Sequence, residues 1–308
     1  MIAWVFPGQG SQFVGMAAGL SGEAARETFA IANDVLGRDL RAAIQEGPDA
    51  FLARTETSQP AILTVSVAVA RSLEAAGVFP DLVAGHSVGE FAALVAAHAM
   101  SFEDALRAVE VRANAMALAG RVTPGRMAAI LGLAIEDVEH ACRSAGSGVG
   151  VAAINGPTQI VVSGESDAVE AAATAARAAG ARRVIPLDVS VAAHSTLMDP
   201  AAVALRSALE RATILPPIVP LVSGVNGRVV DVPAEISNLL CRALTAPVRW
   251  VDAIHTLGQL GATRFYEVGP GRVLTGLMRG IFPAAEATAV GEDDAIAHLA
   301  GELAGDRR

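Results

Sequence analysis

The stretch DLVAGHSVGEFAALVAAHAM, residues 81–100, contains a short apolar run, then a turn with two glycines, then an alanine-rich run. A short apolar run that ends at such a turn is typical of a buried strand, and the run after it has the composition of a helix. A strand followed directly by a helix is the repeating unit of α/β proteins. This stretch therefore predicts an α/β fold with a parallel sheet.

The same alternation of apolar runs and helical stretches occurs on both sides of residues 81–100. We predict further strands at 2–6, 217–224 and 264–268, and helices at 29–40, 235–244 and 251–260. These elements predict a large α/β body in which helices cover the sheet.

Residues 126–189 break this rhythm. They give the order strand, helix, strand, strand, helix, strand (βαββαβ), which is the ferredoxin-like signature. We therefore predict a small ferredoxin-like subdomain at 126–189, inserted into a large subdomain formed by 1–125 and 190–308.

Composition excludes several classes of function. The chain has 308 residues, of which 52% are hydrophobic and 18% charged, as in a compact globular protein. The 23 basic and 32 acidic residues give a net charge of −9, which disfavours nucleic acid and anionic lipid as partners. Every basic residue is arginine, so Schiff-base and pyridoxal phosphate enzymes and Walker-A phosphate loops are excluded.

The sequence predicts a cytoplasmic protein that binds neither a metal nor a membrane. The N-terminus lacks a basic region and reaches Pro7 too early for a signal peptide. Cys142 and Cys241 lack CxxC spacing and fit small buried residues. The longest uncharged stretch, 144–164, is broken by glycines, Asn155 and Pro157, so it is no membrane-spanning helix.

Ser87 is the candidate nucleophile. It stands at the centre of Gly85-His86-Ser87-Val88-Gly89, between the predicted strand and helix, where a nucleophile elbow would lift its hydroxyl clear of the sheet. The helix start behind it favours developing negative charge. The alternative is a glycine-rich turn with a solvated serine.

A serine hydroxyl needs a base, and His194 is the best candidate among the six histidines. It lies in a short predicted loop where residues 126–189 rejoin the large body. His86 is expected to point away from the elbow, and the other four lie in helical stretches: His98, His140, His255 and His298. The alternative for His194 is a structural role.

Two further features suit acyl chemistry. The loop PGQGSQ, residues 7–12, follows the first predicted strand and could bring backbone N–H groups to a reacting centre. Its glycine spacing does not match the dinucleotide fingerprint. Arg112 lies on an apolar helical stretch, where its charge needs a carboxylate from the protein or from a substrate.

Together these features resemble the malonyl-CoA:acyl carrier protein transacylases and related polyketide acyltransferases. The resemblance covers nearly the whole chain, in the order of FPGQGSQ (6–12), TSQPA (57–61), GHSVGE (85–90), VEVRANAM (109–116), NGPTQIVVSG (155–164), AHSTLM (193–198), APVRW (246–250) and YEVGPGRVLTGL (266–277). It implies an α/β-hydrolase-like large body.

The resemblance also implies roles for individual residues. Ser87 would be the nucleophile, His194 the base and Arg112 the clamp for the substrate carboxylate, and the amides of Gln9 and Val88 would form the oxyanion hole. In this family a main-chain carbonyl holds the second histidine nitrogen, usually that of a glutamine. Ala243 occupies that position here, and its carbonyl can serve equally well.

The sequence motifs indicate the type of reaction more clearly than the acyl group that is transferred. The residues before His194 read VAAH, which matches neither the AFH of malonyl-selective nor the YASH of methylmalonyl-selective polyketide acyltransferases. Val88 resembles the small aliphatic residue of the malonyl enzymes, so we favour malonyl.

The resemblance implies a ping-pong transfer of malonyl from coenzyme A to the phosphopantetheine of an acyl carrier protein, through an acyl ester on Ser87 and without a bound cofactor. The alternatives are a serine esterase or thioesterase of the α/β-hydrolase type and a non-catalytic docking subunit. The hydrolase order places histidine near the C-terminus, unlike His194. The pathway, the particular carrier protein and the oligomeric state are left open.

Overall fold

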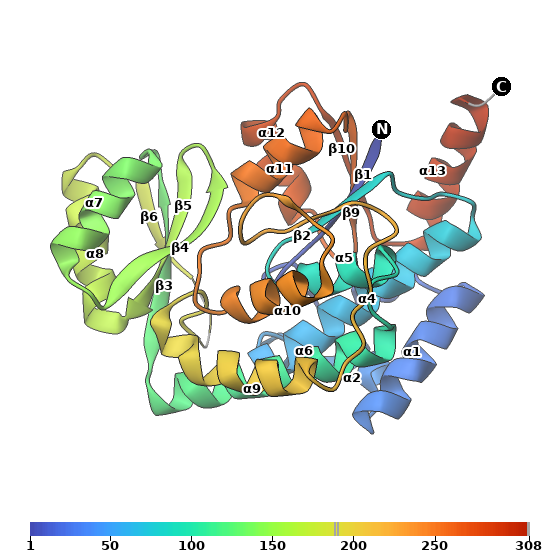
Figure 1. The fold of residues 1–308 in the computed structure, drawn as a ribbon, viewed down its shortest axis with the longest axis horizontal. Coiled ribbons are helices and arrows are strands. Elements are labelled where there is room, and N and C mark those ends of the chain that lie inside the picture. Colours follow the sequence, from blue (N-terminus) through green and yellow to red (C-terminus); the bar gives the residue numbers. More distant parts are fainter. Residues whose placement is uncertain (188, 190, 307–308) are drawn as a thin grey trace.

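The computed structural model describes residues 1–187, 189 and 191–306, and in this part of the chain the strands form two sheets (Figure 1). The elements up to the nucleophile region are β1 (Ile2–Phe6), α1 (Glu23–Leu36), α2 (Leu40–Glu46), α3 (Asp49–Leu52), α4 (Thr55–Ala75), β2 (Leu82–Gly85), α5 (Gly89–Ala96) and α6 (Phe102–Val122). Then come β3 (Gly125–Leu131), α7 (Ile135–Ala145), β4 (Val149–Gly156), β5 (Gln159–Glu165), α8 (Ser166–Ala178) and β6 (Arg183–Pro186). The rest are η1 (Thr196–Met198), α9 (Asp199–Leu209), β7 (Leu221–Val222), β8 (Val229–Val230), α10 (Pro233–Arg242), α11 (Trp250–Gln259), β9 (Arg264–Val268), α12 (Val273–Ile281), β10 (Glu286–Val290) and α13 (Asp293–Asp306).

The large sheet has the strand order β10-β9-β1-β2-β7-β8. Its pairings are parallel from β10 to β7, and only the short β8 is antiparallel in the described chain. Because β1 and β2 are in register, with Phe6 opposite Gly85, their carboxyl ends meet at one edge of the sheet. The loops that follow them, which carry Gln9 and Ser87, therefore lie side by side.

The small sheet has the order β4-β5-β3-β6, and all its pairings are antiparallel. Its element order, β3-α7-β4-β5-α8-β6, is the βαββαβ order predicted for 126–189. Apolar residues of α7 and α8, such as Val138 and Val169, pack on one face. The other face, including Met127 and Val161, shares a core with Trp250 of α11, so the small sheet packs against the large body (Figure 1).

A backbone link also joins the small sheet to the large body. The amide of Ile154 donates to the carbonyl of Val248 at 2.8 Å, and the amide of Val248 donates to the carbonyl of Ala152 at 2.9 Å. This link connects β4 to the segment between α10 and α11, which also supplies acceptors to the active site described below.

The helix predicted at 29–40 is wrong in position. Helix α1 starts earlier, at Glu23, and ends at Leu36, because Gly37 after it takes the left-handed conformation with φ of 63°. Leu40 begins the next helix, α2, because Asp39 caps it by accepting a hydrogen bond from the amide of Ala42. Apolar spacing alone does not reveal the boundary between the two helices, which Gly37 and Asp39 mark.

Two other predicted elements are longer than the observed ones. Within 217–224 only β7, Leu221–Val222, pairs as a strand, because Pro216, Pro217 and Pro220 have no N–H to donate to a ladder. His98 also lies beyond α5, in a left-handed turn with φ of 53°.

Over the described residues, no helix is both long enough and apolar enough to cross a bilayer.

Candidate active site

A sharp turn between β2 and α5 presents Ser87. Ser87 has a φ of 54°, a left-handed conformation that is costly for a residue other than glycine. A Cβ on Gly85 would collide with the backbone of Gly89 and Glu90, and one on Gly89 would collide with the carbonyl of Phe6. Both glycines are therefore needed for the turn, which places the Ser87 hydroxyl at the start of α5.

His194 meets this hydroxyl from the loop between β6 and η1. Its Nε2 lies 3.0 Å from the Ser87 Oγ, although the two residues are 107 positions apart in the chain. His194 is buried and, like Ser87, has a positive φ, 60°. The structure thus brings together the predicted nucleophile and the predicted base.

The partners of the other ring nitrogen fix the tautomer of His194. Nδ1 lies 2.6 Å from the carbonyl oxygen of Ala243 and 3.2 Å from that of Ala246. Because a carbonyl oxygen can only accept, Nδ1 carries the proton and donates it. Nε2 is then left with a free lone pair facing the Ser87 hydroxyl, which is the arrangement a general base requires.

The surroundings of His194 keep its ring neutral. Burial, followed by the positive charge of Arg112 and the influence of His86, lowers the pKa of His194 to about 3, although its two carbonyl partners oppose the shift. A neutral ring is the form that can accept the serine proton.

Arg112 lies on α6 directly beside the dyad. It is 1% exposed, and its Nη2 donates to the Ser87 Oγ at 3.2 Å while its Nη1 donates to the Oε1 of Gln59. Among the described residues, no carboxylate forms an ion pair with it. Burial lowers the pKa of Arg112 to about 10, and the charge of Glu90 opposes this shift, so the guanidinium remains charged at neutral pH.

The loop after β1 lies against the elbow. The amide of His86 donates to the carbonyl of Phe6 at 2.9 Å, which holds the β1 and β2 ends together. Within the described chain, the amides of Gln9 and Val88 donate to no other group. Both N–H groups are therefore available to a ligand near Ser87.

A cavity of about 120 Å³ opens onto the dyad. Its polar lining includes Gln9, Gln59, Ser87 and His194, and its apolar wall comes largely from the small sheet and the loop after β6. Residues that form this wall include Met127, Ala153, Val161, Leu187 and Val191.

His86 does not point away from the site as predicted. It lines the same cavity, where its Nε2 lies 2.8 Å from the Oδ1 of Asn155 on β4, and its ring packs edge-on against Trp250 at 5.3 Å. Burial lowers its pKa. His86 therefore links the elbow to the small sheet.

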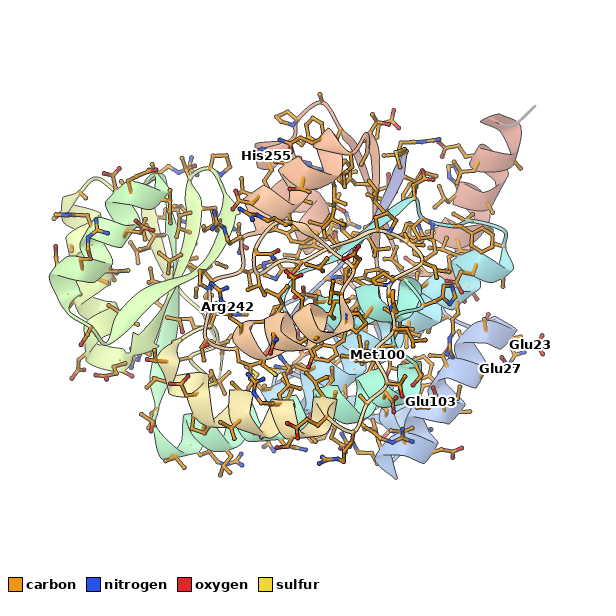
Figure 2. The ribbon with its side chains drawn as sticks, in the orientation of Figure 1. Glu23, Glu27, Met100, Glu103, Arg242 and His255 are labelled. Carbon is orange, nitrogen blue, oxygen red and sulfur yellow. The ribbon has the colours of Figure 1, made fainter. Side chains whose placement is uncertain are left out.

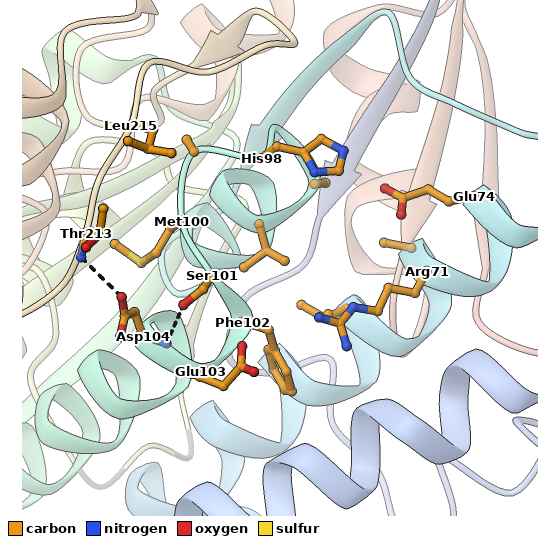
Figure 3. Close-up of a pocket in the computed structure, with 15 residues that line it drawn as sticks. Arg71, Glu74, His98, Met100, Ser101, Phe102, Glu103, Asp104, Thr213 and Leu215 are labelled. Carbon is orange, nitrogen blue, oxygen red and sulfur yellow. Dashed lines mark hydrogen bonds between the residues drawn. The ribbon is translucent and has the colours of Figure 1, made fainter.

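Larger hollows occur elsewhere and contain neither member of the dyad. One, of about 400 Å³, is lined by α4, α5 and the start of α6, with His98, Glu74 and Phe102 on its walls (Figure 3). His255 is exposed on α11 and does not line the cavity beside the dyad (Figure 2). In the described residues, no group of three or more His, Cys, Asp or Glu side chains could hold a metal ion.

Comparisons with known proteins define the family. The family described as acyl transferase domain matches residues 3–300. A malonyl CoA-acyl carrier protein transacylase from Salmonella typhimurium is 43% identical over 299 residues, covering 96% of this chain and 97% of that protein. This chain belongs to the malonyl CoA-acyl carrier protein transacylase family. The resemblance seen in the motifs is confirmed, and the chain is an acyltransferase.

Solved structures of malonyl transacylases share the fold. The malonyl CoA-acyl carrier protein transacylase from Coxiella burnetii has a TM-score of 0.95 and 39% identity, with 98% of this chain and 97% of that one covered. A malonyl-transacylase solved in complex with a type II PKS acyl-carrier protein has a TM-score of 0.93 and 40% identity, covering 98% and 99%. The mixed α/β fold, with its largely parallel sheet and second antiparallel sheet, matches these structures.

Two residues of this transacylase site escaped the sequence analysis. Gln59 accepts a hydrogen bond from Arg112, and its Nε2 also lies 3.4 Å from the Oε1 of Gln9, so it connects Arg112 to the loop after β1. Ala246 is the second carbonyl partner of His194. Gln59 lies in the motif TSQPA and Ala246 in the motif APVRW. Both motifs contribute to the family resemblance, and this was the sequence signal that could have pointed to the two residues.

Proposed function

We propose that this protein transfers a malonyl group from coenzyme A to the phosphopantetheine thiol of an acyl carrier protein, by a ping-pong mechanism through an ester on Ser87. The observation that carries the proposal is the Ser87–His194 contact at 3.0 Å, beside a buried arginine that forms no ion pair with a carboxylate of the described residues. The names of the relatives and the transacylase–carrier protein complex support it.

In the first half-reaction, Nε2 of His194 takes the Ser87 proton as the oxygen attacks the thioester carbonyl. The amides of Gln9 and Val88 stabilise the tetrahedral oxyanion. When the carbon–sulfur bond breaks, the His194 imidazolium returns its proton to the sulfur, coenzyme A leaves and malonyl-Ser87 remains.

The second half-reaction reverses these roles. His194 accepts the proton of the carrier thiol, the sulfur attacks the ester carbonyl, and the proton returns to the Ser87 oxygen as it leaves. These steps use only side chains and amides of the chain, and phosphopantetheine arrives on the carrier protein. The guanidinium of Arg112 would hold the malonyl carboxylate in both half-reactions.

Three structural assignments belong to the same proposal. The nucleophile elbow supports an α/β-hydrolase-like large body, and the order β4-β5-β3-β6 supports a ferredoxin-like small one. We assign 126–189 to the small subdomain and 1–125 with 190–308 to the large. The free thiols of Cys142 and Cys241 support a cytoplasmic location.

The intact mass of the protein after incubation with malonyl-CoA tests this function. We expect the mass to increase by one malonyl group, and the increase to disappear on adding holo carrier protein. A serine esterase would instead release coenzyme A continuously with water alone. Steady release of coenzyme A without carrier protein, and no acyl-enzyme, would contradict the transferase.

The lowered pKa of His194 predicts the pH dependence of acylation. A base works in its neutral form, and a His194 pKa of about 3 keeps the ring neutral far below its usual titration range. We expect the acylation rate to show no loss near pH 6.5 as the pH is lowered. Stopped-flow acylation with a malonyl N-acetylcysteamine thioester, which has no phosphate, checks this. An acid limb centred near pH 6.5 would show that His194 titrates normally.

A further inference from the structure

A buried glutamine contacts the guanidinium of Arg112. Gln59 lies on α4, is 1% exposed, and lines the cavity beside the dyad. Its Oε1 accepts a hydrogen bond from Nη1 of Arg112, whose Nη2 donates to the Ser87 Oγ. Helix α4, which carries Gln59, packs against α6, which carries Arg112. The contact therefore joins two packed helices inside the protein.

The orientation of the Gln59 amide follows from this contact. A guanidinium can only donate hydrogen bonds, so the side-chain oxygen of Gln59 must face Arg112. The Nε2 of Gln59 then points the other way, where it lies 3.4 Å from the Oε1 of Gln9 and 3.5 Å from the sulfur of Met116. The Nε2 of Gln9 in turn donates to the Thr55 Oγ1 at 3.3 Å. Both ends of the Gln59 amide are therefore held.

The acceptor that Gln59 offers to Arg112 carries no charge. A carboxylate at the same place would form a buried ion pair with the guanidinium. Over the described chain, the carboxylates form their ion pairs with other arginines and none with Arg112. The amide therefore orients the guanidinium and leaves it without an ion-pair partner.

Gln59 also lies where a substrate carboxylate would approach. The described residues that line the cavity include Gln59 and Ser87, the two side-chain acceptors of Arg112, but not Arg112 itself. A carboxylate that enters the cavity therefore reaches the guanidinium beside these two side chains. A charge on the side chain at position 59 would act directly on that carboxylate.

We propose that Gln59 is a positioning residue for acyl selectivity, because its neutral amide orients the Arg112 guanidinium without cancelling the charge that a malonyl carboxylate needs. This inference rests on the proposed function. Selectivity is a difference between the binding of two competing groups, here malonyl and acetyl. The amide of Gln59 favours malonyl on two counts, since it orients the cation and does not repel the substrate anion.

Gln59→Glu tests the role of neutrality, because it keeps the size of the side chain and an oxygen that can accept from Arg112. We expect the ratio of malonyl to acetyl loading to fall on the order of 10²-fold, since the new carboxylate pairs with the guanidinium and repels a second one. The variant also lacks the N–H directed at Gln9, a loss that affects both acyl groups alike. The readout is therefore the ratio, measured by single-turnover acylation with malonyl-CoA and acetyl-CoA and by intact mass.

Gln59→Leu tests the role of orientation, because it removes the acceptor and adds no charge. We expect the ratio to fall about tenfold, since the guanidinium keeps its charge but loses one hydrogen bond. In the Arg112→Ala background the same substitution should leave the ratio unchanged, because Gln59 acts through Arg112. Gln259→Glu, at an exposed position of α11, is the matched control for an added carboxylate and should keep the wild-type ratio.

The unfolding midpoint of each variant, measured beside the ratio, shows whether it is folded. A folded Gln59→Glu that keeps the wild-type ratio, or that loses malonyl and acetyl loading equally, would overturn the inference. An equal effect of Gln59→Leu with and without Arg112 would also overturn it, and this comparison decides if Gln59→Glu does not fold. Failure of wild-type Ser87 to become acylated by malonyl-CoA would instead overturn the proposed function.

Discussion

Replacing Ser87 or His194 by alanine is expected to lower malonyl transfer by on the order of 10⁴-fold or more. Ser87→Ala removes the only atom proposed to carry the acyl group, so its mass should not change with malonyl-CoA. His194→Ala leaves the hydroxyl with Arg112 as its neighbour, and a cation cannot accept its proton. Quenched-flow transfer assays and intact mass measure both effects.

A double variant of Ser87 and His194 tests whether the two residues act together. Nucleophile and base act as one unit, so Ser87→Ala/His194→Ala should be no slower than Ser87→Ala alone. His255→Ala, in an exposed part of α11, is the matched control and should keep the wild-type rate. A mass increase in Ser87→Ala, or losses that simply multiply in the double variant, would show that the two residues do not work together.

The elements with strong local signals could be predicted from the sequence. The strand at 2–6 has the observed bounds of β1, and the order of elements in 126–189 is the observed one. In both places short apolar runs end at proline, glycine or polar residues, so the local pattern agrees with the tertiary structure. Where proline or a helix cap interrupts an apolar pattern, as in 29–40 and 217–224, apolar spacing alone gave wrong bounds.

The contacts of the site could be predicted only in part. Ser87 stands in a local motif, whereas the acceptors for His194 are main-chain carbonyls that any residue type could supply. His86 was misplaced because its partner, Asn155, lies 69 positions away on a different sheet.

Replacing Arg112 by alanine is expected to change which acyl group is loaded. The fork of Arg112 is buried beside Ser87 and has neutral partners in the described chain, so a substrate carboxylate would gain a charge-assisted, bidentate contact in a dry site. Such a contact contributes about 3 kcal/mol, so the ratio of malonyl to acetyl loading should fall by about 10²-fold. Single-turnover acylation with malonyl-CoA and acetyl-CoA measures this ratio.

Loss of Arg112 also removes its hydrogen bonds to Gln59 and Ser87, so the control must separate folding from selectivity. The thermal unfolding midpoint of Arg112→Ala, measured beside the loading ratio, shows whether the variant is folded. Arg112→Lys keeps the charge but not the planar fork, so it should retain part of the malonyl preference. Equal losses of malonyl and acetyl loading in Arg112→Ala would show that the guanidinium supports the dyad and does not bind the carboxylate.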